Sequence, residues 1–237
     1  MEYRQTHLDK GGTYDATISG QPFDAYMARI EAAYLREVVP KVVNDRSRYL
    51  DFACGTGRIT ETVSPLVGES VGVDVSDSML AVARQKCPGV RFLCIDVAQE
   101  SADLGQFDLV TAFRFFGNAE DHLRHTVLRA LAGLIRPSGH LIVNNHRNPH
   151  ALGSLIMSAA VRQSGLDLTF GKCQKMLHAH GFKIIAIRSI GLWLVRARAR
   201  NDAALLGSRR AVSAERLFRH RVWAPFAPDC VIVARRC

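Results

Sequence analysis

Short apolar runs alternate with amphipathic segments along most of the chain, and this alternation limits the possible folds more than any other feature. Six runs are rich in apolar residues with few interruptions, which is typical of strands in a parallel sheet that is covered on both faces. They are residues 47–52, 70–75, 90–95, 107–113, 140–145 and 183–189. Strands that alternate with helices form βαβ units with right-handed crossovers. The sequence therefore predicts an α/β fold with a doubly wound, mostly parallel sheet.

The segments between these runs carry the spacing and the end signals of helices. Apolar side chains recur at helical spacing in residues 122–135, and Pro137 with Gly139 predicts that this helix stops before the next strand. Ser76 is a residue type that favours a helix N-cap. The helices expected between the strands are 58–67, 76–86, 122–135 and 168–180.

The two ends of the chain depart from the simple alternation. Residues 21–39 have helical spacing ahead of the first strand, which predicts a helix packed outside the sheet. Residues 230–235 are expected to form a further strand, which follows a helix-like segment at 213–220. The chain has no internal repeat and no low-complexity linker, so we expect a single domain over residues 1–237.

Composition places the chain among globular proteins. A length of 237 residues with 48% hydrophobic residues suffices for one sizeable domain. No apolar run approaches the roughly 20 residues that a membrane-spanning helix needs, and the polar start of the chain does not resemble a secretory signal. The six cysteines form no C-x-x-C pair and show no metal-ligand spacing. We therefore expect a cytoplasmic protein without a metal site or a structural disulfide.

The net charge of +9 is unevenly spread, and much of the excess lies near the C-terminal end. The arginines after Leu194 are Arg196, Arg198, Arg200, Arg209, Arg210, Arg216, Arg219, Arg221, Arg235 and Arg236. An ordinary solvated basic face would account for them. The alternative is an attraction for an anionic partner, such as a phosphorylated substrate, a membrane lipid or a nucleic acid. Neither aromatic interleaving nor a recognised nucleic-acid motif strengthens this alternative.

A glycine-containing loop follows the first strand, and an acid stands at the end of each of the next two strands. Gly55 and Gly57 would let the backbone approach a ligand at the carboxyl edge, where open α/β sheets bind ligands. Asp74 is placed to accept from both hydroxyls of a ribose, and Asp96 to accept from an exocyclic amine. A single acid at such a position is more often a helix cap or a turn. The combination favours a site for a nucleoside cofactor.

A nicotinamide dehydrogenase is the main rival for this architecture. Its fingerprint, G-x-G-x-x-G, needs a third glycine where the helix touches the strand. Thr60 occupies that place here, and an additional acid, Asp51, precedes the loop. No Tyr-x-x-x-Lys pair for hydride transfer follows. A dehydrogenase is therefore the weaker interpretation.

Four segments resemble the motifs of class I (Rossmann-like) S-adenosylmethionine-dependent methyltransferases. They are Leu50-Asp-Phe-Ala-Cys-Gly-Thr-Gly57, Gly72-Val-Asp-Val-Ser-Asp-Ser-Met-Leu80, Phe107-Asp-Leu-Val-Thr-Ala-Phe-Arg114 and Leu134-Ile-Arg-Pro-Ser-Gly-His-Leu141. The resemblance covers about residues 47–145 and looks most like the small stand-alone enzymes of the ubiquinone/menaquinone methyltransferase-like branch. Ala53 departs from the glycine that is usual in the family and keeps a small side chain there.

The resemblance implies seven strands with the last one antiparallel, S-adenosylmethionine as the cofactor and S-adenosylhomocysteine as the product. The cofactor would lie over the loop that ends at Gly57. Asp74 would hold its ribose, and Asp96 with Val97 would bracket its adenine. The cofactor-binding residues implied are Tyr14, Asp51, Ala53, Cys54, Gly55, Thr56, Gly57, Asp74, Val75, Met79, Asp96, Val97 and Phe113.

The methyl group would point toward the end of the fourth strand, which makes Arg114 and His146 the candidate catalytic residues. His146 ends the fifth strand and could act as a general base for an alcohol, phenol or amine. The alternative for it is a histidine bonded to a loop carbonyl. Arg114 lies among phenylalanines and could bind an anionic acceptor. The alternative for it is a salt bridge to Glu120 or Asp121.

Three functions are compatible with these features. The first is methyl transfer to O or N of a small molecule, which could be anionic or linked to a sugar or lipid. In that case residues 1–46 would form an N-terminal lid region, and residues 147–170 would form a substrate-lid insertion. The second is modification of RNA or protein through the basic C-terminal face. The chain lacks the Asn/Asp-Pro-Pro-Tyr/Phe run and the Pro-Cys nucleophile of base methyltransferases. The third is a non-catalytic partner subunit, which the intact cofactor loop disfavours.

Overall fold

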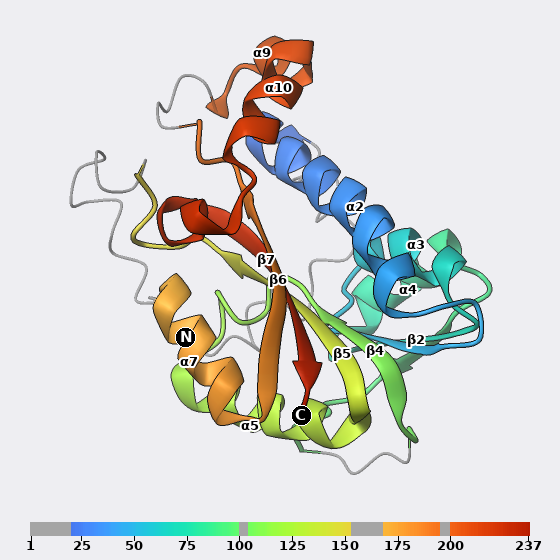
Figure 1. Cartoon of the computed structure of the whole chain (residues 1–237). Coiled ribbons are helices and arrows are strands. Elements are labelled where there is room, and N and C mark those ends of the chain that lie inside the picture. Colours follow the sequence, from blue (N-terminus) through green and yellow to red (C-terminus); the bar gives the residue numbers. More distant parts are fainter. Residues whose placement is uncertain (1–19, 100–103, 153–167, 195–199) are drawn as a thin grey trace.

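The computed structural model describes residues 20–99, 104–152, 168–194 and 200–237, and a seven-stranded sheet with helices on both faces lies within them (Figure 1). The strands are β1 (Arg48–Phe52), β2 (Glu69–Asp74), β3 (Arg91–Cys94), β4 (Phe107–Ala112), β5 (Ile135–His146), β6 (Phe182–Ile190) and β7 (Asp229–Arg236). Their order is β3-β2-β1-β4-β5-β7-β6. All neighbouring pairs are parallel except the two that involve β7, which runs antiparallel to β5 and β6. The predicted sheet, with its antiparallel last strand, is confirmed.

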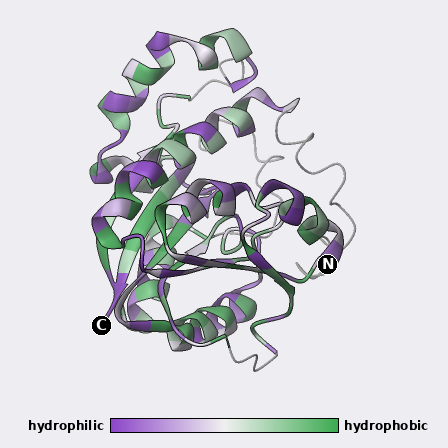
Figure 2. Cartoon of the chain, turned by 90° about the vertical axis from the view of Figure 1, so that its right-hand side faces the viewer, coloured by the Kyte–Doolittle hydropathy of each residue, from purple (hydrophilic) through white to green (hydrophobic). Residues whose placement is uncertain are grey.

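Helices cover both faces of this sheet. They are α2 (Pro22–Val42), α3 (Arg58–Val63), α4 (Asp77–Lys86), α5 (Asp121–Leu134), α7 (Phe170–Ala179), α9 (Ala203–Gly207) and α10 (Arg209–Phe218), with 3-10 helices η2 (Ser64–Leu66) and η4 (Arg221–Phe226). Val110 packs in one apolar cluster with α5 and α7, and Leu109 packs in another with α2 and α3, because successive strand residues face opposite sides. The helices in Figure 2 carry both hydrophilic and hydrophobic residues, as one-sided burial requires.

Two helices begin at serine caps. Ser76 Oγ accepts a hydrogen bond from the Met79 N–H at 3.4 Å and begins α4, as predicted. Ser208 Oγ accepts from the Ala211 N–H at 3.3 Å and begins α10. The predicted segment 213–220 therefore started too late, because the cap, and not the apolar spacing, sets the start of this helix.

The start of β5 also differs from the prediction. Ile135 is fully buried and pairs with Phe107 on β4, so the strand begins directly after α5. Pro137 and Gly139 lie inside the strand and do not separate it from the helix. The pairing then jumps to Leu109 with His140. The intervening residues form an irregular stretch in the strand, as an inserted proline requires.

The predicted lids lie partly outside the described residues, which begin at Gly20 and omit residues 153–167. The roles expected of residues 1–46 and 147–170 therefore stay predictions. Within the described ranges, no helix is long and apolar enough to cross a bilayer. In the same ranges, no group of three or more His, Cys, Asp or Glu side chains could hold a metal ion.

Candidate functional site

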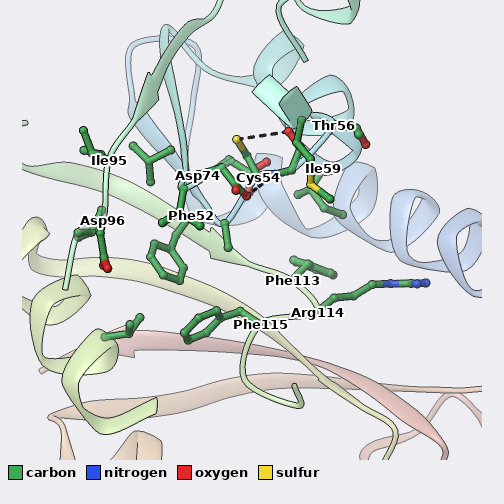
Figure 3. Close-up of a pocket in the computed structure, with 18 of the residues that line it drawn as sticks. Phe52, Cys54, Thr56, Ile59, Asp74, Ile95, Asp96, Phe113, Arg114 and Phe115 are labelled. Atoms are coloured by element: carbon green, nitrogen blue, oxygen red, sulfur yellow. Dashed lines mark hydrogen bonds between the residues drawn. The ribbon is translucent and has the colours of Figure 1, made fainter. Parts of the chain in front are cut away.

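A pocket opens at the carboxyl ends of β1, β2 and β4, where the segments that follow these strands converge (Figure 3). It encloses about 950 Å³, including its open mouth. The predicted site residues that line it are Asp51, Ala53, Cys54, Gly55, Thr56, Asp74, Val75, Met79, Asp96, Val97, Phe113 and Arg114. Gly57 and His146 are not among its lining residues, and Tyr14 lies outside the described residues.

The loop after β1 turns sharply because three of its residues adopt left-handed backbone conformations. The φ angles are 54° at Ala53, 53° at Gly55 and 80° at Gly57. The Gly57 N–H donates to the Cys54 carbonyl at 2.9 Å and closes the turn. A Cβ on Gly57 would lie 3.1 Å from the Cβ of Ala83 on α4, so this glycine also allows α4 to pack closely. The contribution of Gly57 to the site is the shape of the loop.

Asp74 connects this loop to the end of β2. Its Oδ2 accepts from the Gly55 N–H at 2.8 Å, and its Oδ1 accepts from the Ser76 N–H at 3.0 Å. A carboxylate has several acceptor sites, so Asp74 can take part in more than one hydrogen bond while it fixes the loop. Asp96 lies two residues beyond β3 and accepts from the Ala98 N–H at 3.0 Å. Both acids therefore occupy the same edge of the sheet.

Asp51 is a buried acid beneath the loop. It accepts hydrogen bonds from Thr60 Oγ1 at 2.6 Å and from Thr111 Oγ1 at 2.7 Å. Burial raises the pKa of Asp51 to about 6, although both hydroxyl donors favour its carboxylate form. Thr60, which stands where a dehydrogenase needs a glycine, is thus a hydrogen-bond donor to this acid. These contacts connect β1 to α3 and β4.

The side of the pocket that adjoins β4 is apolar and aromatic. Phe113 and Phe115 follow the strand, and the Phe115 ring packs edge-on against Phe52 with 4.9 Å between ring centroids. Leu123 and Val127 of α5 extend the same wall. An apolar or aromatic group bound here would be shielded from water.

Arg114 lies between β5 and α2. Its backbone has a φ of 56°, and its N–H donates to Asn144 Oδ1 at 2.6 Å. Its Nη1 lies 3.4 Å from Oδ1 of Asp24 on α2, an ion pair that the sequence-based alternatives, Glu120 and Asp121, did not include. Figure 3 shows the side chain extending from the pocket toward α2.

His146 is buried at the end of β5, and its Nδ1 lies 2.9 Å from Oδ2 of Asp229 at the start of β7. Burial, together with the nearby Arg114 and Arg147, lowers the pKa of His146 to about 3. Burial also raises the pKa of Asp229 well above its usual value. Burial thus disfavours the charged form of both partners. The observed partner is a side-chain carboxyl and not a loop carbonyl, and the base role of His146 stays a prediction.

Glu31 of α2 is a neighbour of the site that the sequence analysis missed. It is fully buried, and it accepts from Arg58 Nη1 at 2.8 Å and from Asn144 Nδ2 at 3.0 Å. Burial opposes its ionisation, but Arg58 and Arg114 outweigh burial and hold the pKa of Glu31 below its usual value. Arg58 itself lines the pocket. The signal available in the sequence was an acid on the apolar face of a predicted helix.

Comparisons with known proteins agree with this geometry. Residues 50–139 match a family model described as a methyltransferase domain. YqeM of Bacillus subtilis (strain 168) is 28% identical over 140 residues, which are 56% of this chain and 52% of that protein. A ubiquinone biosynthesis O-methyltransferase of Xanthomonas campestris pv. campestris (strain B100) is 27% identical over 168 residues, 66% of this chain and 68% of that protein. The chain thus spans about half of the first relative and about two thirds of the second.

A solved structure shows the same fold over the whole chain. The crystal structure of magnesium protoporphyrin IX methyltransferase from Synechocystis PCC 6803 with bound S-adenosylhomocysteine has a TM-score of 0.69 and 15% sequence identity. The likeness covers 99% of this chain and 98% of that one. Residues 50–139 thus match a methyltransferase domain, and with its sheet order and glycine loop the chain has the fold of the class I S-adenosylmethionine-dependent methyltransferases.

Proposed function

We propose that this chain transfers a methyl group from S-adenosylmethionine to an oxygen or nitrogen of a small-molecule acceptor. The observation that carries the proposal is that one pocket joins the glycine loop and Asp74 to the aromatic wall of Phe113 and Phe115. A cofactor on the loop would face a sheltered space of small-molecule size. The Xanthomonas relative, named a ubiquinone biosynthesis O-methyltransferase, supports an acceptor of this kind.

The residues present fit the cofactor. Asp74, which lines the pocket at the end of β2, would accept from the ribose hydroxyls. Gly55, which has no side chain, would allow the methionine portion to approach the backbone. Met79 and Val97 line the apolar part of the pocket and would contact the adenine, with Asp96 accepting from its amine.

The chain itself has to position the acceptor and exclude water. S-adenosylmethionine, when bound, supplies a methyl group on an already activated sulfur, so alignment alone contributes much of the acceleration. Phe113 and Phe115 would exclude water from the acceptor. We propose that Arg114, oriented by Asp24, binds an anionic group on the acceptor.

The environment of His146 favours a positioning role over that of a general base. Its imidazole is buried, pairs with Asp229 and is absent from the pocket lining. The pair holds the end of β5 against the start of β7, next to Asn144. Asn144 in turn accepts from the Arg114 N–H, so the pair helps to fix the backbone at the acceptor side of the pocket. A base is needed only for an acceptor that must lose a proton.

The test is calorimetric titration with S-adenosylmethionine and S-adenosylhomocysteine. Asp74→Ala should weaken binding at least tenfold, because one hydrogen bond to a charged group contributes about 1.5–3 kcal/mol. Asp77→Ala removes an exposed acid three residues away and should leave the affinity unchanged. Failure of the wild type to bind either ligand, or full affinity in Asp74→Ala, would overturn the assignment.

The acceptor is then found by a turnover screen. The wild-type chain is incubated with labelled S-adenosylmethionine and fractionated metabolite pools, and label transfer to a small molecule is expected. Phe115→Ala opens the aromatic wall and should reduce transfer more than it reduces cofactor affinity, because Phe115 lies on the acceptor side. Label that appears only in RNA or protein would contradict a small-molecule acceptor.

A further inference from the structure

Exposed apolar side chains are concentrated in α10, η4 and the residues between them. Seven large apolar residues are exposed in the described part of the chain, and five of them lie here. The five are Val212, Leu217, Val222, Trp223 and Phe226, with Leu217 74% exposed. Single exposed apolar residues are ordinary, whereas a cluster marks an interaction site.

The same surface is strongly basic. Five exposed arginines lie in the same segment: Arg209, Arg210, Arg216, Arg219 and Arg221. Glu215 is the one acid between residues 209 and 226, and it is buried. The surface therefore presents arginines and apolar groups without an exposed acid between them. We call it the arginine–apolar surface.

Buried contacts hold the arginine–apolar surface in place. Glu215 accepts from Tyr26 Oη at 2.6 Å and from Trp193 Nε1 at 3.0 Å, which fixes α10 on α2 and on the segment after β6. Ser189 Oγ donates to the His220 carbonyl at 2.9 Å and fixes the start of η4 on β6. Leu217 is thus exposed on a helix that is fixed to the rest of the fold, and it stays exposed when the chain is folded.

We propose that the arginine–apolar surface docks on an anionic phospholipid bilayer. Such a surface offers both attractions that interfacial helices use, apolar insertion below the headgroups and basic attraction to anionic lipid. Arginine suits the boundary because its stem can lie along apolar groups while its guanidinium reaches phosphate. A nucleic acid would pair with the arginines but would leave Leu217 and Val222 in water.

The location of the surface suits an acceptor delivered from a bilayer. η4 leads directly into Asp229, which pairs with His146 at the carboxyl end of β5. The pocket opens at the carboxyl edge of the same sheet. Figure 1 shows α9 and α10 beyond the end of α2, at one extremity of the molecule, where a flat surface can reach them. Docking itself does not depend on methyl transfer, so it can be tested separately.

The experiment is sedimentation of the full chain with vesicles of phosphatidylcholine alone and of phosphatidylcholine with phosphatidylglycerol in equal parts. Binding is expected only to the vesicles that contain phosphatidylglycerol. Leu217→Glu should reduce it at least tenfold, since it removes apolar insertion and adds a repelled charge. Replacing Arg209, Arg210 and Arg216 by Gln should reduce it about a hundredfold, because each arginine near an anionic surface contributes a factor of about five.

Matched variants separate docking from general effects of charge and folding. Ile185→Glu places the same acid at an exposed apolar residue of β6, and Gln at Arg36, Arg91 and Lys183 removes equal charge from other exposed positions. Both should bind vesicles nearly as the wild type does.

The proposal is overturned if the wild type does not bind anionic vesicles, if the matched variants lose binding equally, or if RNA competes binding away while Leu217→Glu has no effect. Unchanged S-adenosylhomocysteine affinity in Leu217→Glu will show that the cofactor site is intact.

Discussion

Asp51 and Glu31 are both buried acids beside the pocket, and their surroundings affect their charges in opposite ways. Asp51 accepts from two hydroxyls, which do not offset its burial, and its pKa rises to about 6. Glu31 is also desolvated, but Arg58 and Arg114 more than compensate and hold its pKa below the usual value. Ionisation of Asp51 therefore opposes folding, whereas ionisation of Glu31 favours it.

We predict that Asp51→Asn gains stability relative to the wild type as the pH rises from about 4 to about 6. The folded-state pKa of about 6 exceeds the ordinary 3.8, so the folded chain holds more protons than the unfolded chain in this window. The contribution of Asp51 to stability is complete below the window and is lost as the pH rises through it. The difference in the free energy of unfolding should change by about 2 kcal/mol between about pH 4 and about pH 6, measured by urea denaturation at each pH. The exposed Asp77→Asn should show no such trend, and a flat difference for Asp51→Asn would refute the prediction.

At this scale the sequence predicts which residues form the loop, but not all of their partners. Gly55 and Asp74 were expected at the pocket because they lie at or just beyond strand ends whose positions the apolar runs define. Thr60 was recognised only as the absence of a glycine. Its bond to Asp51 completes a cluster with Thr111 on the neighbouring strand, and only the packed sheet brings these three together.

Among the elements, α10 is a helix in which the hydropathy of the residues does not predict which of them are buried. A helix normally buries its apolar residues and exposes its charges. In α10, Leu217 is exposed whereas Glu215 is buried against Tyr26 and Trp193. Because a polar contact attaches this helix, apolar spacing could not locate its start. α2, in contrast, buries a regular stripe of apolar residues, and its predicted range was nearly right.

We predict that Glu215→Ala releases α10 from α2. The substitution removes an acceptor that Tyr26 Oη, Trp193 Nε1 and the Gly191 N–H share, at a cost of about 2 kcal/mol or more. Hydrogen exchange should accelerate in α9 and α10, while the amides of β5 keep their protection. Glu215→Gln retains an acceptor oxygen and should have a smaller effect. Unchanged protection of α10 in Glu215→Ala would show that this carboxylate is not its anchor.

At the scale of the molecule, α2 connects two parts of the sheet. Local sequence motifs predict the structure of one part better than that of the other. β1 to β4 carry the glycine loop and both pocket acids in short local motifs, and the methyltransferase-domain match covers most of this part. The part built on β5, β6 and β7 includes the connection between β6 and β7, which contacts α2 through Glu215 and Tyr26. Glu31 lies at the junction, because it binds Arg58 beside the pocket and Asn144 on β5. Local patterns could not predict this connection, since its members come from three separate elements.

If Glu31 connects the two parts, its loss must destabilise the whole fold and not one helix. Glu31→Ala leaves Arg58 and the Asn144 amide without their buried acceptor, and breaking a buried ion pair costs about 3–5 kcal/mol. Glu37→Ala is the matched control on α2, because Glu37 makes surface ion pairs with Lys41 and Arg188, which should cost about 1 kcal/mol or less. Urea denaturation at neutral pH measures both, with one cooperative transition expected. Equal losses from the two variants, or a separate early transition confined to α2, would show that Glu31 stabilises only its own helix.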